Sequence, residues 1–245
     1  MRRLGTFVAV VGLLAMTAVG CGEKADADIV DVQLPSETYA ALEKSEAKRF
    51  GMEDMVVGNV KVMASEADVK SGLGNPITER SAGDGSEKTL FYDQMTVTLT
   101  RLDGGYVLTG VRVTGGDWKV ARQLKVGGTR EDILKYFYRD EQCLNNNLMS
   151  PDNETILGKF LYGDFTLESL EKYNGKGAVE YGIINYNGYV DMETAQTLTY
   201  QYVYMDDSFN GEKPSENDDF AQLNVETDRN GIITEISWYY YEEVK

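Results

Sequence analysis

Two stretches of the chain share one pattern of apolar, turn and polar positions. Residues 61–69 align with residues 125–133 at a constant offset of 64. Each stretch has a short apolar lead, a tight turn, Ser65 or Thr129, acidic residues and then an amphipathic segment. A Ser or Thr at this point is typical of a helix N-cap, because its side-chain oxygen accepts a hydrogen bond from a free backbone N–H. The pattern therefore predicts two capped helices, the first ending at Gly74.

Alternating apolar and polar residues after each predicted helix indicate antiparallel hairpins. The first hairpin covers residues 96–113, and the second covers residues 223–240 with Asn230-Gly231 in its turn. Asn-Gly between alternating apolar residues is a strong hairpin signal, because both residues tolerate the positive φ of a tight turn. Residues 89–92 and 197–200 also correspond, so each hairpin is expected to gain a third strand.

Alternation along a strand predicts which face of the sheet is buried. On the last strand the apolar face is expected to carry Ile232, Ile236, Trp238 and Tyr240, and the polar face Glu235 and Ser237. In the first hairpin one face carries Val107, Val111 and Val113, and the other Leu108, Gly110 and Arg112. A sheet with one apolar face needs a cover, and the preceding helices would supply it.

The expected fold class is therefore α+β, with two tandem units that each pack N-terminal helices on a small antiparallel β-meander. The expected divisions are a signal peptide over 1–20, a tether over 21–35, a first unit over 36–117 and a second unit over 118–245. Ser36 predicts the start of a further helix that would reach Phe50. Insertions at 144–157 and 206–220 lengthen the second unit.

The first residues of the chain predict an export signal and a lipid anchor. Arg2 and Arg3 precede an apolar stretch that is short for a spanning helix and typical of a signal peptide. The stretch ends in Ala18-Val19-Gly20-Cys21, which resembles a bacterial lipobox. Cys21 would then be acylated and would anchor the protein to the lipid bilayer at the extracytoplasmic face of the cell membrane. The alternative is an ordinary cleaved signal with an incidental cysteine.

Charge and composition exclude several function classes. The chain has 24 basic and 40 acidic residues, a formal net charge of −16 and no histidine. Such a surface repels phosphate backbones, so no nucleic-acid partner is expected. Without histidine there is no Ser-His-Asp or Cys-His catalysis and no His-ligated metal, and we expect neither a cofactor nor a metal site.

Two further features each have a chemical and a structural interpretation. The acidic residues within 206–219 could hold calcium, but their spacing fits no calcium loop, which favours a solvated loop. Cys143 lacks the basic neighbours that activate a thiol, and with Cys21 lipidated it has no partner for a disulfide. A structural or surface thiol is expected at Cys143.

Tyrosines are concentrated in the second half of the chain, where 13 of the 16 lie from Tyr136 onward. Alternation places Tyr200, Tyr202 and Tyr204 on one sheet face, and it places Tyr239 and Tyr241 opposite Trp238 and Tyr240. These five tyrosines are candidate binding residues, because tyrosine offers a large contact area at little entropic cost. The alternative is that they reflect strand propensity and core packing.

The segment Val126-Gly127-Gly128-Thr129-Arg130-Glu131-Asp132-Ile133, with a lipobox, a tether and a following meander, resembles known bacterial lipoproteins. It is similar to the small lipoprotein of the outer-membrane β-barrel assembly machine, to the tandem β-lactamase-inhibitor protein fold, and to repeats in lipoproteins of Gram-positive gut bacteria. Members of this architecture generally bind proteins or assist assembly. The resemblance implies a non-catalytic module that binds an envelope or secreted protein. The alternatives are an inhibitor of a secreted hydrolase and, in a different class, an exported carboxylate-based hydrolase.

Overall fold

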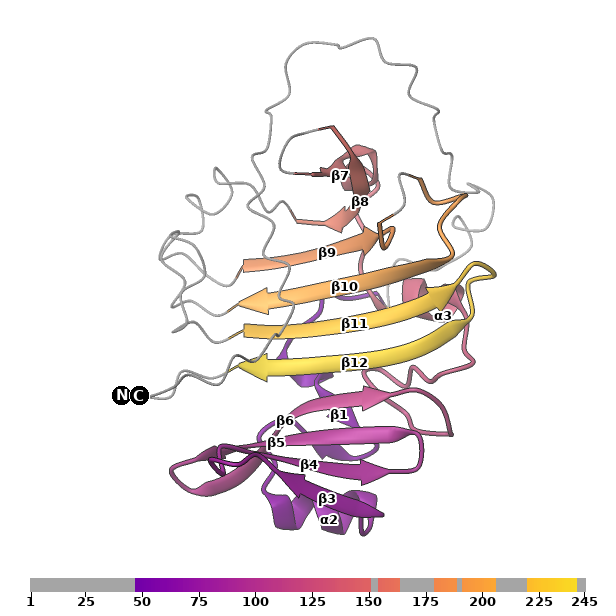
Figure 1. Cartoon of the computed structure of the whole chain (residues 1–245). Helices are drawn as coiled ribbons and strands as arrows, with labels where there is room; N and C mark the ends of the chain where they lie inside the picture. Colours follow the sequence, from indigo (N-terminus) through magenta and orange to yellow (C-terminus); the bar gives the residue numbers. More distant parts are fainter. Residues whose placement is uncertain (1–46, 151–153, 164–178, 189–190, 206–219, 242–245) are drawn as a thin grey trace.

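A computed structural model describes residues 47–150, 154–163, 179–188, 191–205 and 220–241 of the protein (Figure 1). The predicted signal peptide, the tether, Cys21 and the acidic loop at 206–219 lie outside these residues. Most of the helix predicted to begin at Ser36 lies outside them too.

The described residues form a β-rich chain with two short α-helices. The helical segments are η1 (Met52–Asp54), α2 (Glu66–Leu73), α3 (Arg130–Tyr136) and η2 (Cys143–Asn145). The strands up to α3 are β1 (Val56–Val57), β2 (Val60–Lys61), β3 (Thr78–Ser81), β4 (Glu87–Tyr92), β5 (Met95–Leu102) and β6 (Gly105–Val113). The strands after α3 are β7 (Asn147–Met149), β8 (Ile156–Tyr162), β9 (Val179–Asn185), β10 (Thr197–Met205), β11 (Phe220–Asp228) and β12 (Ile233–Tyr241).

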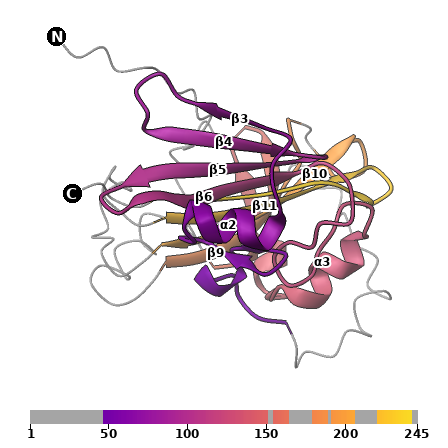
Figure 2. The same ribbon diagram turned by 90° about the horizontal axis from the view of Figure 1, so that it is seen from below.

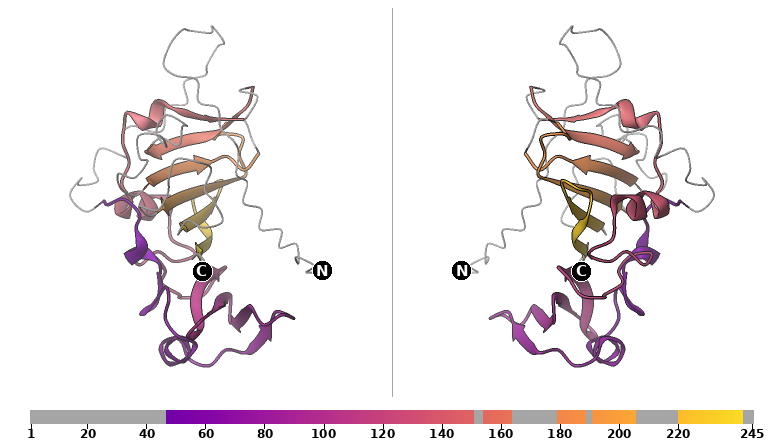
Figure 3. Two further views of the ribbon diagram at one scale, coloured as in Figure 1. Left: turned by 90° about the vertical axis from the view of Figure 1, so that its left-hand side faces the viewer. Right: turned by 90° about the vertical axis from the view of Figure 1, so that its right-hand side faces the viewer.

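Strands β3 to β12 form one sheet of ten strands in the order β3-β4-β5-β6-β12-β11-β10-β9-β8-β7. Every neighbouring pair in it is antiparallel. Figure 1 shows β3, β4 and α2 at one end of the sheet and β7 and β8 at the other. Figure 3 shows the protein from two opposite sides. Strands β1 and β2 pair separately as a small hairpin.

The predicted α+β class, with helices packed on two small meanders, is wrong. The structure is mostly sheet, and the two predicted meanders are joined into one sheet because their last strands, β6 and β12, pair with each other. Each last strand would otherwise leave a row of backbone N–H and C=O groups unpaired, and pairing satisfies both rows. Strands β3, β7, β8 and β9 extend the sheet further at its two ends.

The helices lie on one side of the sheet, as Figure 2 shows for α2 and α3. We call the sheet face toward these helices the covered face and the opposite one the open face. The main core lies between the covered face and the helical layer, and a smaller buried cluster of Leu148, Phe160 and Ile183 lies on the opposite face at the β7–β9 end of the sheet. The largest fully buried side chains of the main core include Trp238, Tyr162, Tyr200, Tyr202, Phe50 and Phe137.

A β-bulge in each half changes the face on which residues lie. The register between β5 and β6 passes over Thr109, and the register between β11 and β12 passes over Thr234. The extra residue shifts the alternation by one position. Leu108 and Ile233 are therefore buried on the covered face, whereas Ile232 is 38% exposed. The predicted faces were wrong for the residues that precede each bulge.

The sequence repeat corresponds to a repeated local structure. Ser65 caps α2, and its hydroxyl accepts a hydrogen bond from Asp68 N at 3.2 Å. Thr129 occupies the same position before α3, where its backbone N–H donates to the Asp132 carboxylate at 2.8 Å. Gly74, at a φ of 84°, ends α2. Both predicted N-cap positions and the predicted stop at Gly74 are confirmed, and the hydrogen bond accepted by the cap side chain is present at Ser65.

The turn before each cap meets the equivalent strand of its own half. Met63 N donates to Leu108 O at 2.8 Å, and Gly127 N donates to Ile233 O at 2.8 Å. Met63 and Gly127 both have positive φ, at 67° and 83°. Glycine adopts this conformation without a steric penalty, whereas Met63 adopts it with a side chain present. The offset from Leu108 to Ile233 is 125 residues.

An approximate two-fold axis relates the two halves of the sheet. The offset of 125 residues makes Ser237 the equivalent of Arg112, and these two residues lie opposite each other where β6 pairs with β12. The same offset makes Ile236 the equivalent of Val111 and Trp238 the equivalent of Val113. The axis therefore exchanges the pair Val113–Ile236 with the pair Val111–Trp238. The division at 117/118 stays a prediction, since the sheet is continuous across the two halves.

The chain before η1 packs on the second half of the protein. Residues 47–50 are not helical, and Lys48 forms a single β-bridge with Phe137, so the helix predicted to reach Phe50 is wrong at this end. Lys48 N donates to Tyr136 O at 3.1 Å, and Tyr138 N donates to Lys48 O at 2.8 Å. Phe50 N donates to the Tyr162 hydroxyl at 3.1 Å. These contacts join the beginning of the described chain to the segment that follows α3.

Candidate binding face

The open face of the central strands is polar and partly exposed. Residues that lie directly opposite each other on antiparallel strands share a face. The registers of β6, β12, β11 and β10 therefore place the following residues on the open face: Gly110, Arg112, Glu235, Ser237, Tyr239, Gln222, Asn224, Glu226, Thr199, Gln201 and Val203. Of these, Ser237 and Val203 are buried. Arg112 is exposed, and Glu235, Tyr239, Glu226 and Gln222 are half-buried.

Two of the five predicted binding tyrosines lie on this open face. Tyr239 is half-buried, and a Cβ atom added to the opposite residue Gly110 would lie 3.3 Å from its Cδ1 atom. The absence of a side chain at Gly110 therefore makes room for the Tyr239 ring. Tyr241 follows on the same face of β12 and is 45% exposed. The predicted alternation against Trp238, which is fully buried, is confirmed.

The other three predicted tyrosines lie on the covered face. Tyr200 and Tyr202 have no exposed surface, and Tyr204 is half-buried at the edge of the core. Tyr202 stacks on Phe137, just after α3, with ring centroids 4.4 Å apart. Burial raises the pKa of the Tyr202 hydroxyl well above its usual value. Tyr200 and Tyr202 are therefore core residues, and the alternative of core packing describes them.

A charged group at the centre of the open face combines two carboxylates with one guanidinium. Arg112 Nε and Nη2 donate to the two carboxylate oxygens of Glu235 at 2.8 and 2.7 Å. Glu226 lies directly opposite Glu235 in the β11–β12 register. Burial, and then the charge of Glu235, raise the pKa of the Glu226 carboxyl, while Arg112 opposes the rise. The cation that opposes the charge of Glu226, Arg112, is thus already hydrogen-bonded to Glu235.

Amide and hydroxyl groups surround the charged residues. Gln222 Nε2 donates to Asn224 Oδ1 at 2.9 Å along β11. Thr199 Oγ1 donates to Asn187 Oδ1 at 3.0 Å beside β10. Such groups rotate to donate or accept, so this surface suits a protein partner that brings its own polar groups. From the sequence, Arg112, Ser237 and Glu235 were predicted only as positions on strand faces, and the polar alternation of β11 is the signal that could have identified this surface.

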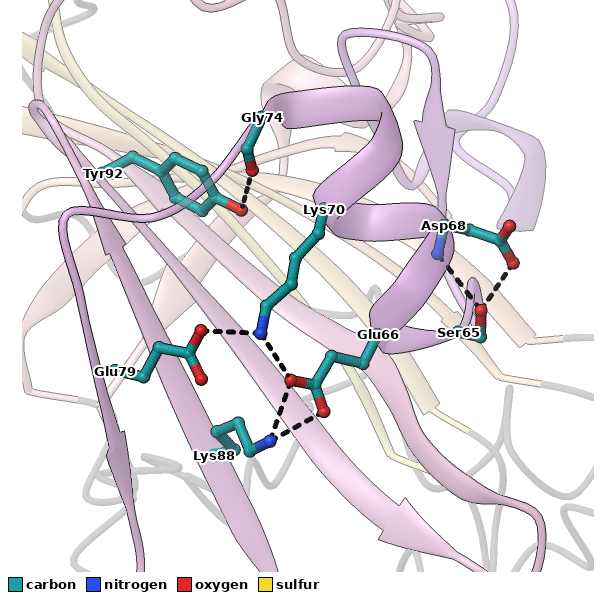
Figure 4. A network of polar contacts seen from close by, with 8 residues as sticks. All are labelled: Ser65, Glu66, Asp68, Lys70, Gly74, Glu79, Lys88 and Tyr92. Carbon is teal, nitrogen blue, oxygen red and sulfur yellow. Dashed lines mark hydrogen bonds and ion pairs between the residues drawn. The ribbon is translucent and has the colours of Figure 1, made fainter.

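A second polar network lies on the covered side and holds α2 against the sheet (Figure 4). The Glu66 carboxylate accepts from Lys70 Nζ at 2.8 Å and from Lys88 Nζ at 2.7 Å. Lys70 also contacts Glu79 of β3 at 2.6 Å. Hydrogen bonds from Lys70 and Lys88 lower the pKa of Glu66, and Glu66 and Glu79 raise the pKa of Lys70. Each charge in this network has a partner within it, so its role is to attach the helix.

A buried ion pair joins η1 to the loop before α3. Arg122 Nε and Nη2 donate to the two carboxylate oxygens of Asp54, both at 2.6 Å. Arg122 also donates to the backbone carbonyls of Lys48, Arg49 and Tyr136. Burial raises the pKa of the Asp54 carboxyl, while Arg122 acts in the opposite direction. The guanidinium is fully occupied, which indicates a structural role.

The described part of the chain offers little for metal or thiol chemistry. It contains no group of three or more Cys, Asp or Glu side chains that could hold a metal ion. Cys143 is half-buried, and its thiol donates to Gly163 O at 3.8 Å. Among the same residues, no helix has the length and apolarity needed to cross a membrane.

Comparison with other proteins adds one structural similarity. No protein-family model matches the chain, and no curated protein sequence does so either. The chain is similar to an extracellular protein containing a SCP domain from Bacillus anthracis str. Ames, with 13% sequence identity and a TM-score of 0.32. The match covers 80% of this chain and 49% of that protein, so the chain spans about half its length. A similarity this weak carries no conclusion about function.

Proposed function

We propose that this protein is a lipid-anchored, extracytoplasmic lipoprotein that binds an envelope or secreted protein through its open face and has no catalytic activity. The lipobox at Cys21 supports the anchor. The open face supports the binding role, because it presents Tyr239 and Tyr241 beside adaptable amide and hydroxyl groups on a regular sheet. The proposal rests on one observation: the sheet packs on the core at one face and presents partly exposed polar and aromatic side chains at the other.

Two physical features make the open face suitable for binding. Tyr239 and Tyr241 lie on a strand near the middle of the sheet, with the core behind it, so little ordering entropy is lost when a partner covers them. The charged group of Arg112, Glu226 and Glu235 lies on the same face and would set orientation.

Site-specific cross-linking in intact cells tests this proposal. A photoreactive phenylalanine derivative in place of Tyr241 samples the open face, and the same derivative in place of Lys135 samples α3 on the other side of the sheet. We expect a discrete protein adduct from position 241 and none from position 135. Adducts of equal yield from both positions, or from position 135 alone, would refute binding through the open face.

A further inference from the structure

The acidic pair on the open face is not required by the fold. Glu226 and Glu235 lie opposite each other at the bulge of the second half. The equivalent bulge of the first half has Thr98 opposite Gly110, with no charge at either position. In each bulge one threonine, Thr109 or Thr234, has no partner in the register. On the neighbouring strand, the residue at the register shift, Leu99 or Thr227, is buried. The protein therefore contains its own control, which shows that this geometry forms without carboxylates.

The two carboxylates are arranged unfavourably in the isolated protein. Like charges that lie directly opposite each other on neighbouring strands destabilise a sheet. Arg112 binds both oxygens of Glu235, and its side chain is 54% exposed. Within the described part of the chain, no hydrogen bond or ion pair involves the Glu226 carboxylate. On the other neighbouring strand, β10, the residue opposite Glu226 is Thr199, which is uncharged.

We infer that the partner of the open face is a protein surface that places a lysine or arginine side chain beside Glu226. This inference rests on the proposed binding function. Arg112 is shared between Glu235 and Glu226 and so compensates the charge of Glu226 only in part; an added cation would neutralise the remainder and weaken the repulsion between Glu226 and Glu235. The net charge of −16 would favour the approach of a basic surface over that of an acidic one.

The side chains around Glu226 suit such a contact. Thr199 and Asn224 supply oxygens that can accept further hydrogen bonds from an ammonium or guanidinium group. The Tyr239 ring lies farther along β12 on the same face and provides an apolar contact beside the charged centre. A partner with one basic side chain amid small polar and apolar groups therefore complements this face better than a uniformly basic one.

Three variants of the full-length, membrane-anchored protein test the inference, each carrying the photoreactive group at position 241. Glu226→Gln removes the charge and keeps the shape, and Glu226→Thr copies the first half of the protein. Glu131→Gln, on α3 at the other side of the sheet, is the matched control, with a side chain that is 51% exposed. We expect both Glu226 variants to lower the adduct yield by about tenfold or more, and the control to leave it unchanged.

Thermal unfolding of the same variants distinguishes loss of contact from loss of fold. Removal of the Glu226 charge relieves repulsion, so the melting temperatures of both Glu226 variants should equal or exceed that of the unaltered protein. An unchanged adduct yield in folded Glu226 variants would overturn the basic partner and leave the proposed binding face standing. Failure of the proposed function itself would instead remove the adduct of the unaltered protein.

A charge exchange gives a second, independent outcome. Glu226→Lys should abolish the adduct, and replacement of the basic residue at the cross-linked site of the partner by glutamate should restore it. Restoration would support a direct contact between the two side chains. A cross-linked partner site without lysine or arginine, or a failure of the exchange to restore the adduct, would refute the inference.

Discussion

Two ion pairs with nearly the same geometry but different burial allow a direct test of what stabilises this fold. Arg122 binds both oxygens of Asp54, and Arg112 binds both oxygens of Glu235. The exposed fractions of the side chains are 14% and 4% for the first pair, but 54% and 25% for the second. Arg122→Met and Arg112→Met remove the same charge and retain a long apolar side chain.

The expected costs differ because only one substitution leaves a buried charge without a partner. Removal of one member of a buried pair costs about 3–5 kcal/mol of unfolding free energy, against a total of about 5–15 kcal/mol for an ordinary domain. An exposed pair contributes about 0–1 kcal/mol. Arg122→Met also removes the donor to Lys48 O and Arg49 O, which attach the residues before η1. We therefore expect a loss of about 3–5 kcal/mol for Arg122→Met and less than about 1 kcal/mol for Arg112→Met.

Urea unfolding, followed by the fluorescence of the buried Trp238, measures both costs. The pH dependence supplies a second criterion. Burial raises the folded-state pKa of Asp54 above its usual value of 3.8, so its favourable contribution is complete below that pH and is lost as the pH rises through the raised pKa. Without Arg122 this pKa should rise further, and Arg122→Met should lose stability more steeply with increasing pH. Equal costs for the two arginine variants, or no change in the pH dependence, would refute the reasoning.

Three further predictions follow from burial, capping and the lipobox. Tyr202→Ser removes a fully buried ring and should cost about 3–5 kcal/mol, whereas Tyr239→Ser should cost less than half as much; urea unfolding of the two variants measures the difference. Ser65→Ala should cost about 0.5–2 kcal/mol, through loss of the hydrogen bond that caps α2, and a shift in the melting temperature measures it. Cys21→Ser should abolish incorporation of a fatty-acid analogue and release the protein from the membrane; retained label would contradict acylation at this residue.

Local features of the chain were predictable because their causes lie within a few residues. Ser65, Thr129 and Gly74 satisfy or end the backbone hydrogen bonds of adjacent residues, so their types identify the helix boundaries. The two predicted hairpins are confirmed for the same reason, since short turns join strands of clear alternation. The bulges at Thr109 and Thr234 were not predicted, because an extra residue leaves no composition signal of its own.

The continuous sheet could not be predicted from the sequence, because it depends on pairing between distant strands. Strand β3 consists of Thr-Glu-Arg-Ser, has four exposed residues and has no apolar alternation, so only its position beside β4 makes it a strand. Strand β7 has three residues, and glycines interrupt the apolar runs of β8 and β9. Gly182 of β9 has a reason that the sequence does not show, since a Cβ atom there would lie 2.7 Å from Cε1 of Tyr162.

The candidate site was only partly predictable, since alternation assigns residues to faces without showing which face is covered. It correctly separated Tyr239 from Trp238 on β12. It placed Tyr200 and Tyr202 on one face of β10 but gave no sign that Phe137 packs on Tyr202. Helix α3 precedes β10 by about 60 residues of chain, and no local pattern relates elements at that separation.

The approximate two-fold axis separates what the fold needs from what function adds. Both halves keep the N-cap before the helix, the bulge in the hairpin and the buried residues Leu108 and Ile233, because each satisfies backbone groups or fills the core. On the open face the halves differ, with Arg112 on the axis opposite Ser237 and the acidic pair in the second half alone. Packing in a symmetrical sheet would accept the same residues in both halves. The partner proposed above would therefore contact the two halves of one continuous face in different ways.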